Sequence, residues 1–409
     1  MRTVLTRLAG FAGFPLLSAV VPIFVMPIIA RIAGPLGWSS IGSGLAIGIF
    51  ASTVILFGWN IEGPVRIARS GDVQVRLRIY GESIGTRLLL CIVVMPVAAA
   101  LVYLISAPAH RFDAILIALS AASGGLSPAW YFIGIGNPRL LGIVDTIPRV
   151  VASLISIPLL LITGQIWLYA AMQIIATVVT MRIFLHLAPG SRGKAPKIVW
   201  KLGDMLCILR SQAAAAGVNL AGNAYGSTPV PIATATVSGP GASNFASADQ
   251  LYRYALFPVV VLANAFQGWA LEFDGEQGRR RQLAAIGAHV LLGVVGGALL
   301  AVFGPLVSSI MFGPALAAGQ VTSVFYGLAL CFLCIAAPLQ RNVLIPAGRA
   351  SLVFGVTVAA ALAGVSTMVV FGTLKSVDGI AFGMAASEAI VLLLLIKPSI
   401  KALRSDYMS

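Results

Sequence analysis

The stretch "LAGFAGFPLLSAVVPIFVMPIIA" (residues 8–30) contains no charged side chain. A helix of about 20 apolar residues is long enough to cross the roughly 30 Å hydrocarbon layer of a membrane. Arg2 and Arg7 precede this run, as basic residues do in a signal peptide. The run is longer than a signal-peptide core, however, and further apolar runs follow it, so it predicts a first helix that stays in the membrane.

Similar apolar runs recur along the whole chain, which has a mean hydropathy of +0.97, with 59% hydrophobic and 10% charged residues. A soluble domain carries about 25% charged residues, so this composition excludes a soluble protein. The runs do not alternate between apolar and polar residues as the strands of a membrane β-barrel would. We therefore predict an all-α polytopic membrane protein with about twelve transmembrane helices. We place them at residues 8–30, 38–59, 86–107, 113–133, 142–162, 166–187, 206–237, 251–271, 284–310, 318–338, 351–372 and 378–396.

The distribution of basic residues predicts the orientation, because cytoplasmic loops of membrane proteins carry an excess of Lys and Arg. With both termini placed in the cytoplasm, the outer side receives four of the 27 basic residues and the inner side the other 23. Removing one span would exchange the sides of every later loop and abolish this asymmetry. The four outer residues are Arg31, Arg111, Arg253 and Lys375.

The longest polar connection is "APGSRGKAPKIVWKLGDM" (188–205), which is basic and central. It separates six predicted spans from six others, and transporters often have two such halves with the substrate path between them. We therefore predict two six-helix lobes. Their bounds are 1–190 for the N-terminal lobe, 191–205 for a basic cytoplasmic linker, 206–396 for the C-terminal lobe and 397–409 for a cytoplasmic tail.

Charged residues at membrane depth are costly and are therefore candidate functional residues. Arg31 and Arg253 stand on the sparsely basic outer side, which makes them the first candidates for a substrate role. Asp145 with Arg149, and Asp249 with Arg253, have the i,i+4 spacing that lets an acid and a base pair on one helix face. The candidates for substrate contact are Arg31, Arg253, Arg149 and Arg210, and those for gating or coupling are Asn60, Glu62, Asp145, Asp249 and Glu388.

Several of these candidates also have a purely structural interpretation. Arg149 and Arg210 lie near predicted cytoplasmic helix ends, where long arginine stems extend to the membrane interface. Asp145 and Arg149 are equally compatible with a simple intrahelical ion pair. Glu388 is compatible with a hydrogen-bonding group that faces the protein interior.

Motifs for catalysis are absent from the sequence, which contains no HExxH and no P-loop. Its three histidines fall in unrelated segments. Cys331 and Cys334 form a CxxC in an apolar context and are interpreted as packing residues. We therefore expect no enzyme activity, no metal site, no cofactor and no nucleic-acid partner.

Four segments carry a resemblance to a known family: "PIFVMPIIARIAGPLGWSSIGSGLAIG" (22–48), "LSPAWYFIGIGNPRLLGIVDTIPRV" (126–150), "SNFASADQLYRYALFPVVVLANAF" (243–266) and "FGPLVSSIMFGPALAAG" (303–319). They resemble polysaccharide flippases of the MOP superfamily (Wzx-type exporters of O-antigen and exopolysaccharide). The resemblance implies two lobes around a cationic cavity that flips undecaprenyl-pyrophosphate-linked oligosaccharide across the bacterial inner membrane for surface polysaccharide synthesis. It also implies that Arg31 matches a first-span arginine of related lipid II flippases, although Ile32 stands where some members have an acidic residue.

The partners that this resemblance implies are a lipid-linked oligosaccharide, membrane lipids, and at one remove a polysaccharide polymerase and a chain-length regulator. A pyrophosphate is polyanionic and suits arginine, which binds it bidentately.

Two alternative functions remain. A multidrug or cation antiporter of the same fold would need carboxylates in the N-terminal lobe, and the first span has none. A membrane-embedded polysaccharide polymerase or ligase would display a large outer loop with Arg and His, and the longest predicted outer connection, 238–250, contains neither.

Overall fold

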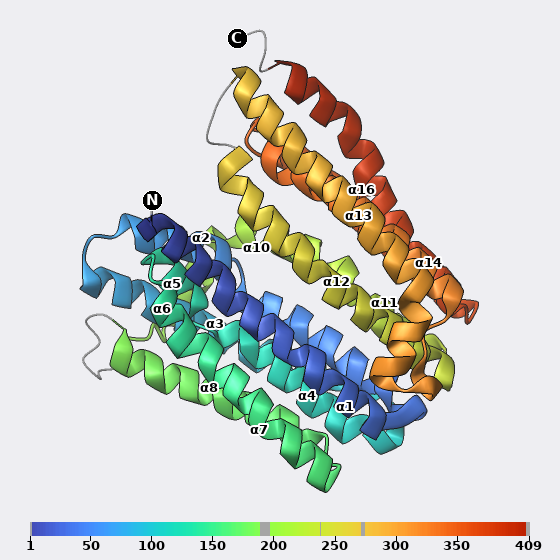
Figure 1. Cartoon of the computed structure of the whole chain (residues 1–409). Coiled ribbons are helices and arrows are strands. Elements are labelled where there is room, and N and C mark those ends of the chain that lie inside the picture. Colours follow the sequence, from blue (N-terminus) through green and yellow to red (C-terminus); the bar gives the residue numbers. More distant parts are fainter. Residues whose placement is uncertain (1, 189–196, 238, 271–274, 406–409) are drawn as a thin grey trace. The chain divides into compact units, whose positions relative to one another are not determined.

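The computed structural model describes residues 2–188, 197–237, 239–270 and 275–405. Every secondary-structure element in these ranges is a helix (Figure 1), which confirms the predicted all-α fold class. Residues 191–196 of the predicted linker and 406–409 of the predicted tail lie outside the described residues.

The first helix, α1 (Arg2–Leu56), holds the first two predicted spans. It is interrupted at Gly34, whose φ of 66° and ψ of −173° are not helical. Glycine adopts this left-handed φ without the steric cost that a Cβ atom imposes. The break therefore separates one apolar helix from the next without a loop.

In the described chain, nine segments are long and apolar enough to cross a membrane, judged by length and composition. The first of them, Val20–Arg69, contains the Gly34 break and accounts for two predicted spans. Two further predicted spans correspond to α10 (Ala213–Ser227) with α11 (Pro229–Thr236), and to α12 (Pro240–Ala270). The nine segments account for ten predicted spans, because the first holds two. With the two further helical regions, all twelve predicted spans are matched in order.

The chain divides into two compact units, and unit 1 comprises Met1–Ala33 and Ser40–Asn223. Its interior holds an aromatic cluster of Trp59, Tyr80, Trp130, Tyr131 and Phe184. Within this unit, α7 packs on α8, α4 on both α3 and α8, and α2 on α5. Besides the parts of α1 and α10, its elements are α2 (Trp59–Arg69), α3 (Val73–Ile105), η1 (Pro108–His110), α4 (Arg111–Ser123), η2 (Gly124–Leu126), α5 (Ala129–Gly134), α6 (Pro138–Leu141), η3 (Gly142–Thr146), α7 (Ile147–Thr163), α8 (Trp167–Leu187) and α9 (Leu202–Ser211).

Unit 2 comprises Gly34–Ser39 and Ala224–Ser409. In its first segment, the Trp38 indole donates to the Ser247 hydroxyl at 3.2 Å and stacks on Phe312. The helix pair α13 and α14 and the pair α15 and α16 make its main contacts. Besides α11, α12 and part of α10, its elements are α13 (Gly275–Phe312), η4 (Pro314–Leu316), α14 (Gln320–Pro338), η5 (Leu339–Leu344), α15 (Ala350–Thr373) and α16 (Val377–Ser405).

Small residues at helical spacing bring helices into close contact inside each unit. In unit 1, a Cβ atom on Gly44 or Gly48 would overlap the backbone carbonyl of Ala114 or Ala118 on α4. In unit 2, Gly297 lies equally close to the Gly327 carbonyl on α14. These pairs therefore serve packing within the chain, because only hydrogen side chains fit at the contact.

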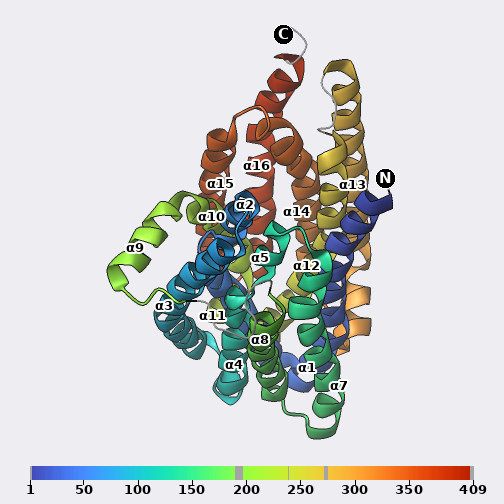
Figure 2. The same ribbon diagram turned by 90° about the vertical axis from the view of Figure 1, so that its left-hand side faces the viewer.

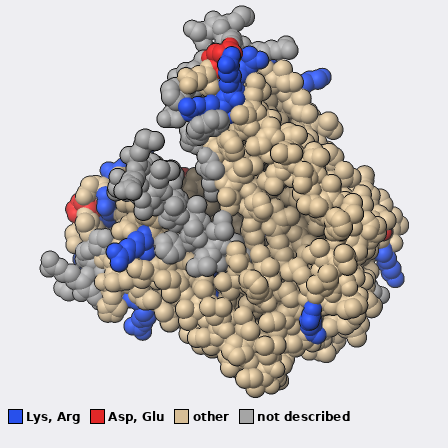
Figure 3. Space-filling model, viewed as in Figure 1, with Lys and Arg blue, Asp and Glu red and all other residues tan. Residues whose placement is uncertain are grey.

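The outward faces of the long helices are apolar. On α3, Ile92, Val93 and Leu104 are exposed, and on α13 the same holds for Leu291 and Val302. Figure 3 shows broad areas of the surface without charged atoms. Such large apolar surfaces are expected where lipid, and not water, surrounds the protein.

The structure corrects two details of the sequence predictions for the middle of the chain. The predicted span 206–237 is not one helix, because α9 ends at Ser211 and a further break precedes Pro229. The predicted outer connection 238–250 is helical from Pro240 onward, as the start of α12. Two of its residues, Ser243 and Ser247, are buried, because the Ser243 hydroxyl accepts from the Ser39 amide and the Ser247 hydroxyl accepts from the Trp38 indole.

Candidate functional site

In unit 1, the acid–arginine pair predicted from its spacing is present. Asp145 lies in η3, a π-helical turn, and Arg149 follows one turn later in α7. The Arg149 guanidinium donates from Nε and Nη2 to Asp145 Oδ1 at 3.4 and 3.3 Å, and the Ser127 hydroxyl donates to the same oxygen at 2.7 Å. π-helical turns are rare and are frequent at functional sites, which draws attention to this pair.

Arg87 on α3 lies next to this pair, although in the sequence it is only one of the basic residues on the predicted inner side. Its side chain is fully buried and donates from Nη1 to the Gly125 and Ser127 carbonyls at 3.1 and 2.9 Å. The guanidinium also lies over the rings of Tyr80 and Trp130. Ser127 joins the two arginines, because its carbonyl accepts from Arg87 while its hydroxyl donates to Asp145.

We call Arg87, Ser127, Asp145 and Arg149 the unit 1 cluster. It contains two arginines and one carboxylate. Arg87 fits where η2 ends, since the last carbonyls of a helical turn have no partner within the helix and carry partial negative charge. One sequence feature could have indicated the burial of Arg87, namely the group of aromatic residues around Trp130, which can cover a cation.

Polar side chains extend the interior of unit 1 from this cluster along α4, α7 and α8. Ser123 and Thr177 are 3.0 Å apart, and the Gln173 amide donates to the Ser153 hydroxyl at 2.6 Å. Each pair joins two helices that are otherwise apolar. Buried polar groups are expensive without partners, so these bonds fix how the helices face one another.

In unit 2, the second predicted pair is present and is held more tightly. Arg253 donates from Nε to Asp249 Oδ2 at 2.6 Å and from Nη2 to the Gly226 carbonyl at 2.9 Å. The Tyr326 hydroxyl donates to the other Asp249 oxygen at 2.9 Å. Both partners of this pair are therefore held by further hydrogen bonds inside the unit.

Glu388 on α16 is linked to the Asp249–Arg253 pair by two consecutive residues, Tyr225 and Gly226. The Tyr225 hydroxyl donates to Glu388 Oε1 at 3.0 Å, and Tyr225 precedes the Gly226 carbonyl that Arg253 binds. Glu388 is 2% exposed. We call Asp249, Arg253, Tyr326, Tyr225 and Glu388 the unit 2 cluster, and it contains two carboxylates and one arginine.

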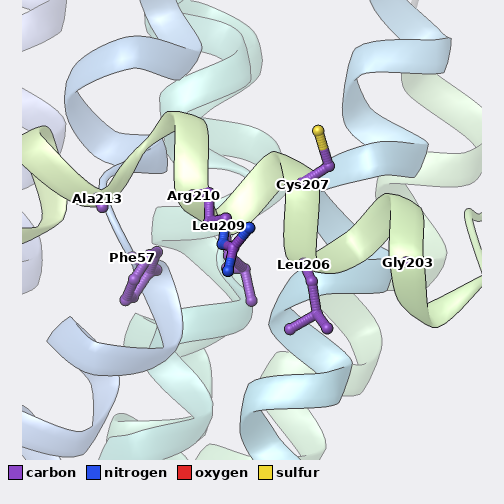
Figure 4. A pocket seen from close by; sticks show the side chains of 7 residues that line it. All are labelled: Phe57, Gly203, Leu206, Cys207, Leu209, Arg210 and Ala213. Carbon is purple, nitrogen blue, oxygen red and sulfur yellow. The ribbon is translucent and has the colours of Figure 1, made fainter.

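The remaining predicted site residues lie outside the two clusters. Arg31 is exposed on α1, and Glu62 is half-buried on α2. Asn60 accepts a hydrogen bond from the Asn219 amide at 3.3 Å within unit 1. Arg210 is exposed on α9 and lines a cavity with Phe57 and Leu206 (Figure 4). No group of His, Cys, Asp or Glu that could hold a metal ion occurs among the described residues.

Comparisons with known proteins find the fold but no relative by sequence. No family model and no curated protein matches the chain. The solved structure of the lipid II flippase MurJ in an inward closed conformation matches with a TM-score of 0.68 at 13% identity, covering 97% of this chain and 90% of that chain. An inward-facing multidrug resistance transporter of the MATE family, in the MOP superfamily, matches with a TM-score of 0.63 at 16% identity, covering 94% of this chain and 95% of that chain.

A third solved structure, a MOP superfamily transporter from Pyrococcus furiosus whose binding pocket is described as having reverse polarity, matches with a TM-score of 0.52 at 17% identity over 97% of this chain and 96% of that chain. At these identities the likeness concerns the arrangement of helices. The chain therefore has the fold of the MOP-superfamily transporters.

Proposed function

We propose that this chain is a flippase that moves lipid-linked oligosaccharide, carried on undecaprenyl pyrophosphate, across the bacterial inner membrane by alternating access. The observation that carries this proposal is the excess of arginine in the unit 1 cluster, which holds Arg87 and Arg149 but a single carboxylate, Asp145, paired with Arg149. A site with this balance attracts a polyanionic pyrophosphate and repels a cation, and the effect is strengthened away from bulk water. The similarity to MurJ, which is a lipid II flippase, supports the same class of cargo.

Within the unit 1 cluster, Arg149 is the residue that we propose for phosphate contact. Its bonds to Asp145, at 3.3 and 3.4 Å, are longer than the roughly 2.7–2.9 Å of a strong charge-assisted bond. Arg149 therefore keeps donor groups for an incoming anion. Arg253 has a shorter bond to Asp249, at 2.6 Å, and a second bond to Gly226, so its release would need a rearrangement of unit 2.

We propose that Glu388 couples transport to proton movement. Arg253 is already neutralised by Asp249, so the Glu388 carboxylate has no cation of its own within the unit 2 cluster. An uncompensated carboxylate buried at membrane depth is costly, and binding a proton removes that charge. Tyr225 is placed to change its hydrogen bond with Glu388 when the proton arrives.

The proposal is tested with the purified chain in proteoliposomes that contain a fluorescent undecaprenyl-pyrophosphate oligosaccharide, whose flipping is followed by the loss of protection from a membrane-impermeant quencher. Arg149→Ala should slow flipping by about tenfold or more, because one charged hydrogen bond is worth roughly 1.5–3 kcal/mol. Arg139→Ala, at an exposed position on α6, is the matched control and should flip at the wild-type rate. Wild-type flipping by Arg149→Ala would remove this residue from the mechanism, and no flipping by the wild-type protein would end the proposal.

A second candidate function is export of organic cations by proton exchange. The unit 2 cluster favours it, because Asp249 and Glu388 give that cluster an excess of carboxylate, and the similarity to a multidrug MATE transporter points the same way. The same proteoliposomes distinguish the two functions when they are given a fluorescent organic cation and an imposed pH gradient. Cation movement driven by the gradient, without lipid flipping, would favour the antiporter.

The cellular setting is part of the proposal. The basic residues support an orientation with both termini in the cytoplasm. A flippase of this kind would deliver its cargo to a polysaccharide polymerase and a chain-length regulator. Reporter fusions at each terminus would test the orientation directly.

A further inference from the structure

A cavity of about 520 Å³ lies in unit 1 at the break between α1 and α2, beneath the short helix α9 (Figure 4). Its volume is in the range of small-molecule sites, which is roughly 300–1,000 Å³. Most lining side chains are apolar, and the one charged side chain is that of Arg210. The lining residues are Phe57, Gly203, Leu206, Cys207, Leu209, Arg210 and Ala213.

The wall that α9 contributes is firmly anchored. The carbonyls of Lys197 and Val199, just before α9, lie so close to Gly81 and Gly85 of α3 that no Cβ atom would fit there. On α9 itself, Met205 is buried. Figure 2 shows α9 beside α3, with which it makes contact. The wall of the cavity is therefore packed against the rest of unit 1.

The floor of the cavity is formed at a strained point of the backbone. Phe57 has a φ of 38°, in the left-handed region that residues with a Cβ atom rarely occupy. This conformation ends α1 and places the Phe57 ring against the cavity. In Figure 4, Phe57, Leu206, Leu209 and Arg210 extend to the same side of α9, while Cys207 points away.

The segment around α9 has the composition of a helix that lies at a membrane surface. Trp200, Leu202 and Leu206 are exposed, and so are two cations of the same segment, Lys197 and Lys201. Tryptophan and lysine are enriched where hydrocarbon meets the headgroups. An amphipathic helix with this pattern binds anionic lipid surfaces through its apolar side chains and its positive charge together.

We propose that this cavity is a binding site for an anionic phospholipid of the surrounding membrane. Arg210 binds the headgroup phosphate, and the first part of an acyl chain packs against Phe57, Leu206 and Leu209. An amphiphile with one negative charge is complementary to an apolar cavity with one cation at its edge, next to a helix that faces lipid. This site is independent of the flippase proposal, and it gives Arg210 a lipid partner other than the cargo.

The experiment uses the purified full-length chain in detergent micelles with phosphatidylglycerol or phosphatidylcholine that carries a photoactivatable diazirine on the acyl chain. After irradiation, mass spectrometry of peptides measures the labelling of residues 202–213. Labelling of the lipid-facing part of α3 around Ile92, which is exposed, reports general contact with lipid. Phosphatidylglycerol should label 202–213 in preference to phosphatidylcholine, whereas the α3 peptide should show no preference.

Arg210→Gln should lower the phosphatidylglycerol labelling of 202–213 by about fivefold, since one basic residue at a lipid surface is worth roughly 1 kcal/mol. Arg139→Gln removes the same charge from another exposed site and should leave the labelling unchanged. Ala213→Trp, which fills the cavity, should lower labelling by both probes. The α3 peptide shows in each case that the variant is folded and in contact with lipid.

Two results would overturn the proposal. The first is equal labelling of 202–213 by the two probes, with no effect of Arg210→Gln. The second is displacement of phosphatidylglycerol from this peptide by a stoichiometric amount of undecaprenyl phosphate, which would make the cavity a cargo site.

Discussion

Replacement of Arg87 by methionine tests the structural basis of the unit 1 cluster. The variant keeps an unbranched side chain of similar length but removes the donors for the Gly125 and Ser127 carbonyls, which accept at 3.1 and 2.9 Å. Two charged hydrogen bonds contribute about 3–6 kcal/mol to stability. Part of this loss is offset, because the variant no longer has to bury a charge away from water. We therefore expect a net loss of about 3 kcal/mol in the free energy of unfolding.

The assay is thermal unfolding of the purified chain in detergent. For a unit of this size, 1 kcal/mol shifts the Tm by about 2–4 °C, so Arg87→Met should unfold about 6–12 °C below the wild-type protein. Arg78→Met, on the same helix, is the matched control, because the Arg78 side chain is 81% exposed and its ion pair with Glu82 is long, at 3.7 Å. Exposed pairs contribute about 0–1 kcal/mol, so the control should change little. Equal Tm values for Arg87→Met and Arg78→Met would refute the assignment of Arg87 as the residue that holds η2 in place.

Three further predictions concern other contacts. Glu388→Gln should abolish the dependence of flipping on a pH gradient while movement down the lipid gradient persists; a variant that still responds to the gradient would exclude this carboxyl as the coupling group. Tyr326→Phe should destabilise the protein by about 1–3 kcal/mol in thermal unfolding, because it leaves a buried Asp249 oxygen without its donor, whereas Tyr252→Phe should be nearly neutral, since the Tyr252 hydroxyl has no hydrogen-bond partner among the described residues. Gly48→Val should cost about 1–3 kcal/mol or more by forcing α1 away from α4, and an unchanged Tm would contradict the close contact between the helices.

The two clusters have opposite excess charge. The unit 1 cluster has two arginines and one carboxylate, whereas the unit 2 cluster has one arginine and two carboxylates. A cycle that binds an anionic cargo in one unit and a proton in the other would use this division. The neutral pair of Asp249 and Arg253 would then serve mainly to hold α12 and α14 together through Tyr326.

Sequence spacing predicted those contacts that lie within one helix. The pairs of Asp145 with Arg149 and of Asp249 with Arg253 are present, because residues four apart always share a helix face. Contacts between helices had no such signal. The bond from Tyr326 to Asp249 joins residues 77 positions apart, and the bond from Tyr225 to Glu388 joins residues 163 positions apart.

The amino-acid sequence by itself determined that the chain is a bundle of membrane helices, because hydrocarbon admits only helices or closed barrels, and runs of apolar residues without alternation specify the helices. It also located most helices, since length and hydropathy are local properties. The tertiary structure decided which charges are buried and what they bind. From the sequence alone, Arg87 is expected to be a surface charge. It is buried within a cluster only because α3 packs against η2 and α5 in the folded chain. Burial and partnership depend on segments that are distant along the chain, and no local pattern carries that information.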